Sequence, residues 1–89
     1  MPRLTLTQHL DRFVAWSPRD VPGTTAAAVL DAAFVDCPAL RGYVLDDQGR
    51  VRKHVMILVD GEMIRDRLTL TDPVGPQQEV FVMQALSGG

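Results

Sequence analysis

Residues Ala26–Asp36 restrict the possible folds of this chain more than any other segment, because they form a clear helical pattern between two strand-like regions. Alanine, which is frequent in this segment, has the strongest intrinsic preference for the helix. Thr24 or Thr25 can cap the N-terminus by accepting a free backbone N–H, and Pro38 is expected to end the helix. Four side chains share the i, i+3, i+4, i+7 spacing of one buried stripe. They are Leu30, Ala33, Phe34 and Cys37.

Two extended segments are predicted before this helix. Residues 3–7 alternate polar and apolar side chains, which is typical of a half-buried strand. Residues 8–11 are expected to form a turn. Residues 12–21 are expected to be extended as well, but Pro18 lacks the N–H that a strand ladder needs. This segment is therefore predicted to be an edge strand or an irregular one.

After the helix, residues 39–53 are expected to form a connector that contains a small hairpin around the turn sequence 46–49. Residues 54–59 form the strongest strand pattern of the chain. Asp60 and Gly61 follow this strand and are a pair preferred in two-residue hairpin turns. The next three residues can therefore pair back on the strand.

The last strand, residues 79–85, is apolar on both faces, which favours a central position in a sheet. The order of elements is strand, strand, helix, strand, short strand, strand. This order predicts an α+β fold in which a mixed sheet wraps over one main helix, with the first and last strands as parallel neighbours. We expect one domain, residues 1–85, followed by a flexible tail, residues 86–89.

Size and composition argue against several classes of protein. A chain of 89 residues leaves little room for the cleft of about 300 Å³ or more that most small-molecule enzymes need. The net charge of −2 shows no basic face for nucleic acid, and the short basic run 50–54 is expected to be a solvated loop. No apolar stretch approaches the roughly 18 residues of a membrane span. Because the N-terminus also lacks a signal-peptide pattern, we expect a cytoplasmic protein.

The sequence contains no constellation of residues for catalysis or for metal binding. His9 and His54 have no partner at ligand spacing, so no metal site is expected. Cys37 is the single cysteine, which excludes an intrachain disulfide and predicts inert packing. Ser87 has no neighbour that would make it a nucleophile.

The sequence stops on two glycines, directly after the apolar, strand-like run 79–87. Glycine has no Cβ, so such an end forms a thin arm that can approach another surface closely. Four extended residues span about 13–14 Å, which is enough to cross the wall of a partner's active site. We expect the carboxylate of Gly89 to be the reactive group of the protein. The tail that carries it consists of Leu86, Ser87, Gly88 and Gly89.

This pattern resembles the ubiquitin-like β-grasp proteins, and among them the sulfur carriers of the MoaD/ThiS family. The resemblance is carried by the Pro-Gly-Thr sequence at 22–24, by the strand and turn 54–62, and by the last strand with its glycines, 79–89. The tail departs from that of ubiquitin, because residues 84–87 are uncharged. It also departs from the molybdopterin carrier, which has two prolines where this chain has Met-Gln at 83–84.

The resemblance implies a carrier that is not itself an enzyme and that binds no cofactor. In that family, an ATP-dependent adenylating enzyme of the ubiquitin-activating type activates the carboxylate that corresponds to Gly89. A sulfide or a persulfide, supplied by a rhodanese or a desulfurase, then displaces AMP and leaves a thiocarboxylate. A downstream synthase accepts the sulfur. The connector at 40–44 looks most like that of carriers that serve cysteine or thio-metabolite synthesis, and a cofactor pathway is an alternative.

Two other functions remain open at this point. The chain can be a protein modifier that is joined through Gly89 to lysines of other proteins. Lys53 is the only lysine, which counts against chains built of linked copies. The third possibility is a non-covalent β-grasp interaction module whose terminal glycines are incidental.

Strand alternation predicts a partner face on the sheet. β-Branched residues pack well against a helix. The predicted core set is Val55, Ile57, Val59, Val80 and Val82. The predicted outer set is Met56, Leu58, Phe81 and Met83. An exposed apolar patch of this kind is typical of a surface that binds a partner protein. The alternative is that a loop or a second copy of the chain covers it.

Overall fold

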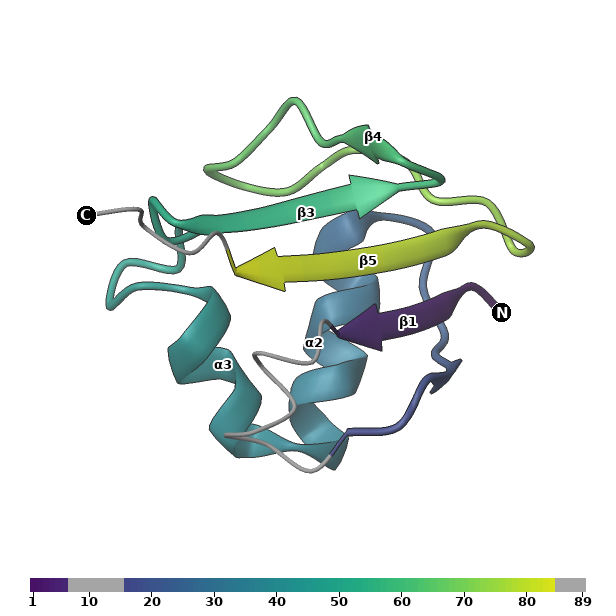
Figure 1. Ribbon diagram of the computed structural model, residues 1–89, viewed down its shortest axis with the longest axis horizontal. Helices are drawn as coiled ribbons and strands as arrows, with labels where there is room; N and C mark the ends of the chain where they lie inside the picture. The colour runs from purple at the N-terminus through teal and green to yellow at the C-terminus, as the bar shows by residue number, and fades with distance from the viewer. Residues whose placement is uncertain (7–15, 85–89) are drawn as a thin grey trace.

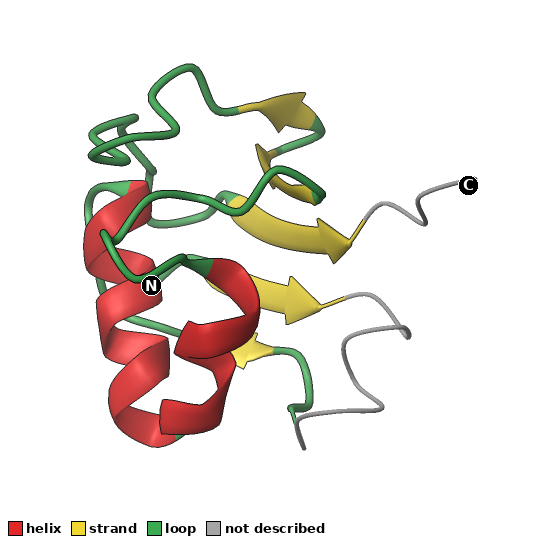
Figure 2. Cartoon of the chain, turned by 90° about the vertical axis from the view of Figure 1, so that its left-hand side faces the viewer, coloured by secondary structure: helices red, strands yellow, loops and turns green. Residues whose placement is uncertain are grey.

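The computed structural model describes residues 1–6 and 16–84, which form an α+β fold with five strands in one mixed sheet and two helices on one of its faces (Figures 1 and 2). The strands are β1 (Arg3–Leu6), β2 (Arg19–Asp20), β3 (Val55–Val59), β4 (Glu62–Met63) and β5 (Glu79–Gln84). The helices are α2 (Ala26–Asp36) and α3 (Pro38–Val44). The strand order across the sheet is β2-β1-β5-β3-β4.

Strand β5 lies at the centre of the sheet, as its apolar sequence predicts. It pairs in parallel with β1, where Leu4 lies opposite Val80, and antiparallel with β3, where Ile57 lies opposite Val82. The helix-containing crossover joins β1 to β5 and makes the parallel pairing possible. The first and last strands are therefore neighbours, as predicted.

The strand-and-turn prediction for β3 and β4 is also confirmed. Asp60 and Gly61 have φ of 51° and 86°, the left-handed backbone that a two-residue turn of type I′ requires. Leu58 and Met63 are paired across this turn. Strand β3 begins one residue later than predicted, because His54 belongs to the turn that precedes it.

Helix α2 has the predicted bounds, and Thr25 is its N-cap. The Thr25 hydroxyl accepts a hydrogen bond of 3.1 Å from the backbone N–H of Ala28. The buried side chains of the helix are Ala26, Val29, Leu30, Ala33 and Phe34. Cys37, the predicted last member of the buried stripe, is only partly buried, because it caps the helix with non-helical backbone.

The prediction of a connector at residues 39–53 was wrong for its first part, because residues Pro38–Val44 form the second helix, α3. Proline is favoured in the first turn of a helix, where its missing N–H costs no hydrogen bond. Leu40 and Val44, four residues apart, are fully buried in the core. Pro38 therefore starts a new helix as well as following the end of α2. The predicted hairpin is present as one antiparallel bridge between Leu45 and Val51.

Strand β2 is a short edge strand beside β1, in agreement with the prediction for this segment. Trp16, which precedes it, is buried and donates its indole N–H to the carbonyl of Leu4 at 3.1 Å. The predicted turn 8–11 and the first part of the segment 12–21 lie outside the described residues.

The core lies between the sheet and the two helices. Four of the five predicted core residues are completely buried, namely Val55, Ile57, Val80 and Val82. Val59 is partly exposed, because it is the last residue of β3 before the turn, but it still packs against the core. Among the described residues, no charged or polar residue is buried in this core.

Candidate functional site

The four residues of the predicted partner face are partly exposed and lie on the face of the sheet that the helices do not cover. Figure 2 shows both helices on the other face. Its members form two cross-strand pairs between β3 and β5. Met56 lies opposite Met83, and Leu58 lies opposite Phe81. Each of the four side chains is neither fully buried nor fully exposed. The structure thus brings together all four residues that strand alternation assigned to the outer face.

Met63 extends this surface and was missed by the sequence analysis. It lies opposite Leu58 on the neighbouring strand β4, so the two side chains share a face. Its side chain is 52% exposed, whereas the next residue, Ile64, is buried. The sequence signal for this position is the alternation of side chains at 62–64. We call Met56, Leu58, Met63, Phe81 and Met83 the outer-face patch.

The last described residue before the tail is Gln84, at the end of β5. It lies opposite Val55 and therefore on the core-facing side of the sheet. Its side-chain Oε1 is buried and accepts no hydrogen bond from any described residue. The predicted tail follows after Ala85, and its residues Leu86, Ser87, Gly88 and Gly89 lie outside the described residues.

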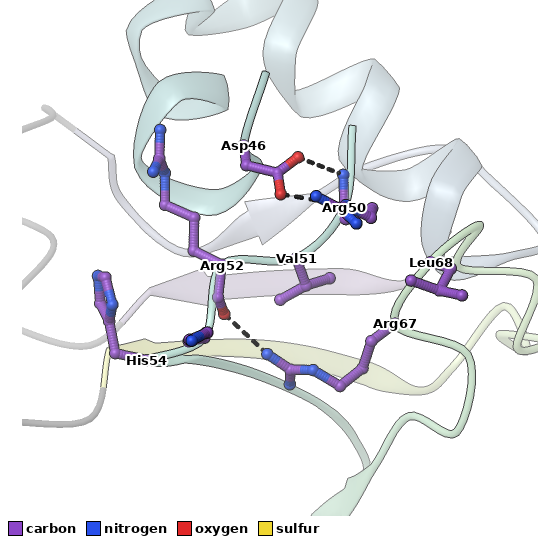
Figure 3. A pocket seen from close by; sticks show the side chains of 8 residues that line it. Asp46, Arg50, Val51, Arg52, His54, Arg67 and Leu68 are labelled. Atoms are coloured by element: carbon purple, nitrogen blue, oxygen red, sulfur yellow. Dashed lines mark hydrogen bonds and ion pairs between the residues drawn. The ribbon is translucent and has the colours of Figure 1, made fainter. Parts of the chain in front are cut away.

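A basic cavity of about 640 Å³ lies at the end of the sheet where β5 ends and β3 begins (Figure 3). Two apolar side chains, Val51 and Leu68, line part of it. Its charged and titratable lining residues are Asp46, Arg50, Arg52, Lys53, His54 and Arg67. The sequence predicts a solvated loop for the run 50–54. Lys53 and His54 are exposed, but the run also forms one wall of this cavity.

Arg67 connects the two sides of the cavity. Its Nη2 donates hydrogen bonds of 2.7 Å to the carbonyl oxygens of Arg52 and of Val55. Arg52 in turn donates from Nε to the carbonyl oxygen of Gly42, at the end of α3, at 2.8 Å. The loop from β4, the segment before β3 and the end of α3 are thereby held together by cationic side chains bound to backbone carbonyls.

The loop that carries Arg67 is organised by two carboxylates. Asp72 accepts hydrogen bonds from the backbone N–H groups of Arg65 and Asp66 at 2.9 and 2.8 Å. Asp66 accepts from the hydroxyl and backbone N–H groups of Thr69 and Thr71. These hydrogen bonds hold the pKa of Asp66 well below its ordinary value of 3.8, and the hydrogen bond from the Thr69 hydroxyl has the largest effect. The carboxylate is therefore ionised at neutral pH and keeps the loop in place.

Asp46 is the one carboxylate among the residues that line the basic cavity. Its two oxygens accept from the backbone N–H of Arg50 at 3.0 Å and from the Arg50 Nε at 3.3 Å. Hydrogen bonds from the backbone N–H groups of Arg50 and Gln48 lower the pKa of Asp46. Asp46 therefore offsets the charge of Arg50, whereas Arg52, Lys53 and Arg67 have no carboxylate partner among the described residues.

The described residues contain neither a metal-binding cluster nor a membrane-spanning helix. No group of three or more His, Cys, Asp or Glu side chains is placed to hold a metal ion among residues 1–6 and 16–84. No helix in this part of the chain is long and apolar enough to cross a membrane.

Solved structures with the same fold define the class of protein. SAMP1 from Haloferax volcanii is 27% identical, with a TM-score of 0.79 over 98% of this chain and 97% of that chain. A chain in the crystal structure of the Amycolatopsis orientalis BexX/CysO complex has a TM-score of 0.84 over 100% of both chains, at 13% identity. The Haloferax volcanii HVO 2177 protein has a TM-score of 0.68 over 99% of this chain and 85% of that chain, at 22% identity. The fold is thus that of the ubiquitin-like β-grasp proteins.

Sequence comparison gives the family. The model of the ThiS family matches residues 14–89, which include the last strand and the two glycines. No curated protein matches the chain in sequence. The chain belongs to the ThiS family, in the class of ubiquitin-like sulfur carriers or modifiers.

Proposed function

We propose that this protein is a sulfur carrier, and that the carboxylate of Gly89 is the group that receives the sulfur. The observation that supports this most strongly is that a diglycine sequence follows the central strand β5 after three residues, and that the match to the ThiS family extends through it. A rigid β-grasp body then presents a thin arm whose backbone can enter a narrow active site.

The chemistry needs a partner enzyme that binds ATP. A Gly89 carboxylate oxygen attacks the α-phosphorus of ATP, the bond to the β-phosphate breaks, and pyrophosphate leaves. Sulfide then attacks the carbonyl carbon of the acyl-adenylate, and AMP leaves with the C–O bond electrons. With a persulfide as donor, the product is first an acyl disulfide, which a second thiol reduces to the thiocarboxylate. The partner supplies the metal ion and the charge stabilisation for phosphoryl chemistry, so the carrier needs no catalytic residue.

The outer-face patch is the proposed docking surface for the adenylating enzyme. Its apolar side chains are half exposed on the sheet face opposite the helices. Three of its five members are methionines, whose flexible thioethers adapt to different partners, including a sulfur donor and a downstream synthase. A chain with this fold lies in the crystal structure of the BexX/CysO complex, which supports a protein partner.

Intact-mass measurement tests the proposal. The purified protein is incubated with ATP, sulfide and the ubiquitin-activating-type adenylating enzyme of the same organism. Replacement of one carboxylate oxygen by sulfur should add about 16 Da to the carrier. Omission of ATP is the control and should leave the mass unchanged. No gain of mass in the complete reaction, with an adenylating enzyme that is active on ATP, would contradict the proposal.

Conjugation to other proteins is the second candidate function, and the likeness to SAMP1, a small archaeal modifier protein, favours it. The same acyl-adenylate can react with a lysine amine instead of sulfide. The products differ, because a modifier forms an amide bond between Gly89 and a lysine of a target. Lysine adducts that end in the Gly-Gly sequence of this chain would support this function. A thiocarboxylate without such adducts would support the carrier alone.

A further inference from the structure

Positive charge is concentrated at the end of the sheet where β5 ends. Of the nine Lys and Arg residues of the chain, four line the basic cavity. Asp46 is the single carboxylate in that lining, although the chain has eleven acidic residues and a net charge of −2. The cavity is therefore a positive region on a protein that is negative as a whole. A separation of charge of this kind steers and orients a partner of opposite charge.

Apart from Arg50, which is paired with Asp46, the cationic side chains of the cavity form no ion pair with a described residue. Arg52 and Arg67 donate to backbone carbonyl oxygens, which are dipoles and carry no net charge. Lys53 and His54 are exposed and form no hydrogen bond or ion pair with other described residues. Figure 3 shows the side chains of Arg52 and His54 on the same side of the segment that leads into β3. Their charged or titratable groups are thus available to a partner.

The basic cavity lies at the end of β5, which the tail follows in the sequence. Gln84, the last described residue of β5, is paired with Val55, and Lys53 and His54 directly precede Val55 in the chain. The following residues, 85–89, span at most about 17 Å when fully extended. If Gly89 reaches the ATP of an adenylating enzyme, as the proposed function requires, the opening of that active site must lie within about 17 Å of this end of the sheet.

We infer that the basic cavity receives a carboxylate-bearing segment of the adenylating enzyme, beside the opening through which the tail enters. This inference rests on the proposed function. Charge complementarity at an interface raises the association rate and fixes the orientation of the two proteins. Here it would align β5 with the opening, while the outer-face patch supplies apolar contact area on the adjacent sheet face.

The arrangement of donors favours carboxylates spread along a protein segment over a single phosphate group. A bound phosphate needs several donors that converge on one point. In the basic cavity, Arg50 is turned to Asp46, Arg52 is bound to the end of α3, and Arg67 is bound to the carbonyls before and at the start of β3. The charges are therefore separated, and acidic side chains spaced along a segment can match them.

Steady-state kinetics of carrier-dependent ATP–pyrophosphate exchange tests the inference. Lys53→Glu reverses an exposed charge of the cavity without removing a hydrogen bond of the described structure. We expect the KM for the carrier to rise about tenfold, with kcat unchanged, because docking is weakened while the tail is intact. The matched control is Arg3→Glu, which makes the same change of charge at the other end of the sheet, about 17 Å away along β5. Its KM should stay within about twofold of the wild type.

Two further measurements use the same proteins. The KM of the wild type should rise with NaCl concentration, and that of Lys53→Glu should change less, because the attraction is screened by salt. In NMR titrations at constant ionic strength, a hexaglutamate peptide should shift the backbone amides of residues 50–54 saturably, and inorganic phosphate should not. Saturable binding of phosphate without binding of hexaglutamate would overturn the inference in favour of a small-anion site.

The kinetic results separate this inference from the proposed function. If the wild type supports no exchange at any salt concentration, the proposed function is contradicted, and the inference is lost with it. If the wild type supports exchange and Lys53→Glu has the same KM and the same salt dependence, the docking inference alone is overturned. An equal rise of KM in Lys53→Glu and Arg3→Glu also overturns it, because the effect would then belong to net charge and not to the cavity.

Discussion

Leu58 of β3 and Phe81 of β5 lie directly opposite each other on the sheet face that neither described helix covers. Both side chains are half exposed, and Met63 continues the same row on β4. A central aromatic side chain with apolar neighbours is the usual anchor of a protein–protein interface. The pair therefore lies at the centre of the proposed docking surface.

Replacement of Phe81 by Asp should reduce activation by the adenylating enzyme about 30-fold or more, because it places a charge at the centre of an apolar contact. The assay is carrier-dependent ATP–pyrophosphate exchange, with circular dichroism to verify the fold. Val35→Asp is the matched control, because Val35 is also apolar but is 80% exposed on helix α2. Normal activation of the Phe81→Asp protein would exclude the outer-face patch as the docking surface.

Gly23 should tolerate no larger side chain. Its φ is 147°, and a Cβ at this position would lie 2.6 Å from the backbone nitrogen of Val29 and 2.9 Å from the carbonyl carbon of Ala28. Both atoms belong to the backbone of α2 and cannot move independently. Gly23→Ala should therefore lower the free energy of unfolding by about 3 kcal/mol or more.

Gly49→Ala is the control for this substitution. Gly49 also has a positive φ, 79°, but a Cβ there meets no atom within 4 Å. The cost should be limited to the backbone strain of about 1–2 kcal/mol. Urea denaturation measures both variants. Equal losses of unfolding free energy in the two variants would show that the close approach of the added Cβ to α2 does not lower the stability.

The side-chain oxygen of Gln84 should lower the free energy of unfolding of the protein. It is buried and unpaired in the described structure, and a buried acceptor without a donor loses its hydrogen bonds to water. Gln84→Met keeps the length of the side chain and removes the acceptor. We expect the free energy of unfolding to rise by about 1 kcal/mol in chemical denaturation. A loss of stability of that size would indicate that the oxygen has a partner when the protein is in solution.

Stability should fall in acid through the carboxylate of Asp66. Its folded-state pKa lies below the ordinary value of 3.8 because of hydrogen bonds from Thr69 and Thr71. A group with a lowered pKa stabilises the fold above its unfolded-state pKa, and this contribution is lost as the pH falls through the window between the two values. The pKa values of Asp46 and Asp72 are lowered as well, so the stabilisation from these two carboxylates is also lost as the pH falls.

The measurement for this prediction is the urea midpoint as a function of pH. For the wild type, the midpoint should decrease as the pH is lowered below about 4. Asp66→Asn should be less stable at neutral pH and should show a shallower decrease, because it retains no titrating group at this position. A wild-type midpoint that is constant from neutral pH to about pH 3 would contradict the prediction.

The sequence predicted those parts of the fold whose signals are local. The bounds of α2 follow from its alanines, from the Thr25 cap and from the residues before Pro38. The two faces of β3 and β5 follow from alternation, because a strand changes face at every residue. Helix α3 was missed because Pro38 was read only as the end of one helix, although proline is also favoured at the start of the next.

The basic cavity could not be predicted from the sequence in the same way. Arg67 reaches the carbonyls of Arg52 and Val55 from 15 and 12 residues away in the chain. No local periodicity links these positions. The run 50–54 is visible in the sequence, but its role as one wall of a cavity depends on the tertiary contact that Arg67 makes.

The most direct test of the account is the position of the transferred sulfur. After reaction with ATP, sulfide and the adenylating enzyme, fragment-ion mass spectrometry should place a gain of about 16 Da on the C-terminal peptide, at Gly89. A chain that lacks Gly89 should keep its melting temperature, because a terminal residue contributes little to stability, and should gain no mass. Sulfur found on Cys37 instead, or a mass gain in the chain without Gly89, would contradict the claim that the carboxylate of Gly89 is the reactive group.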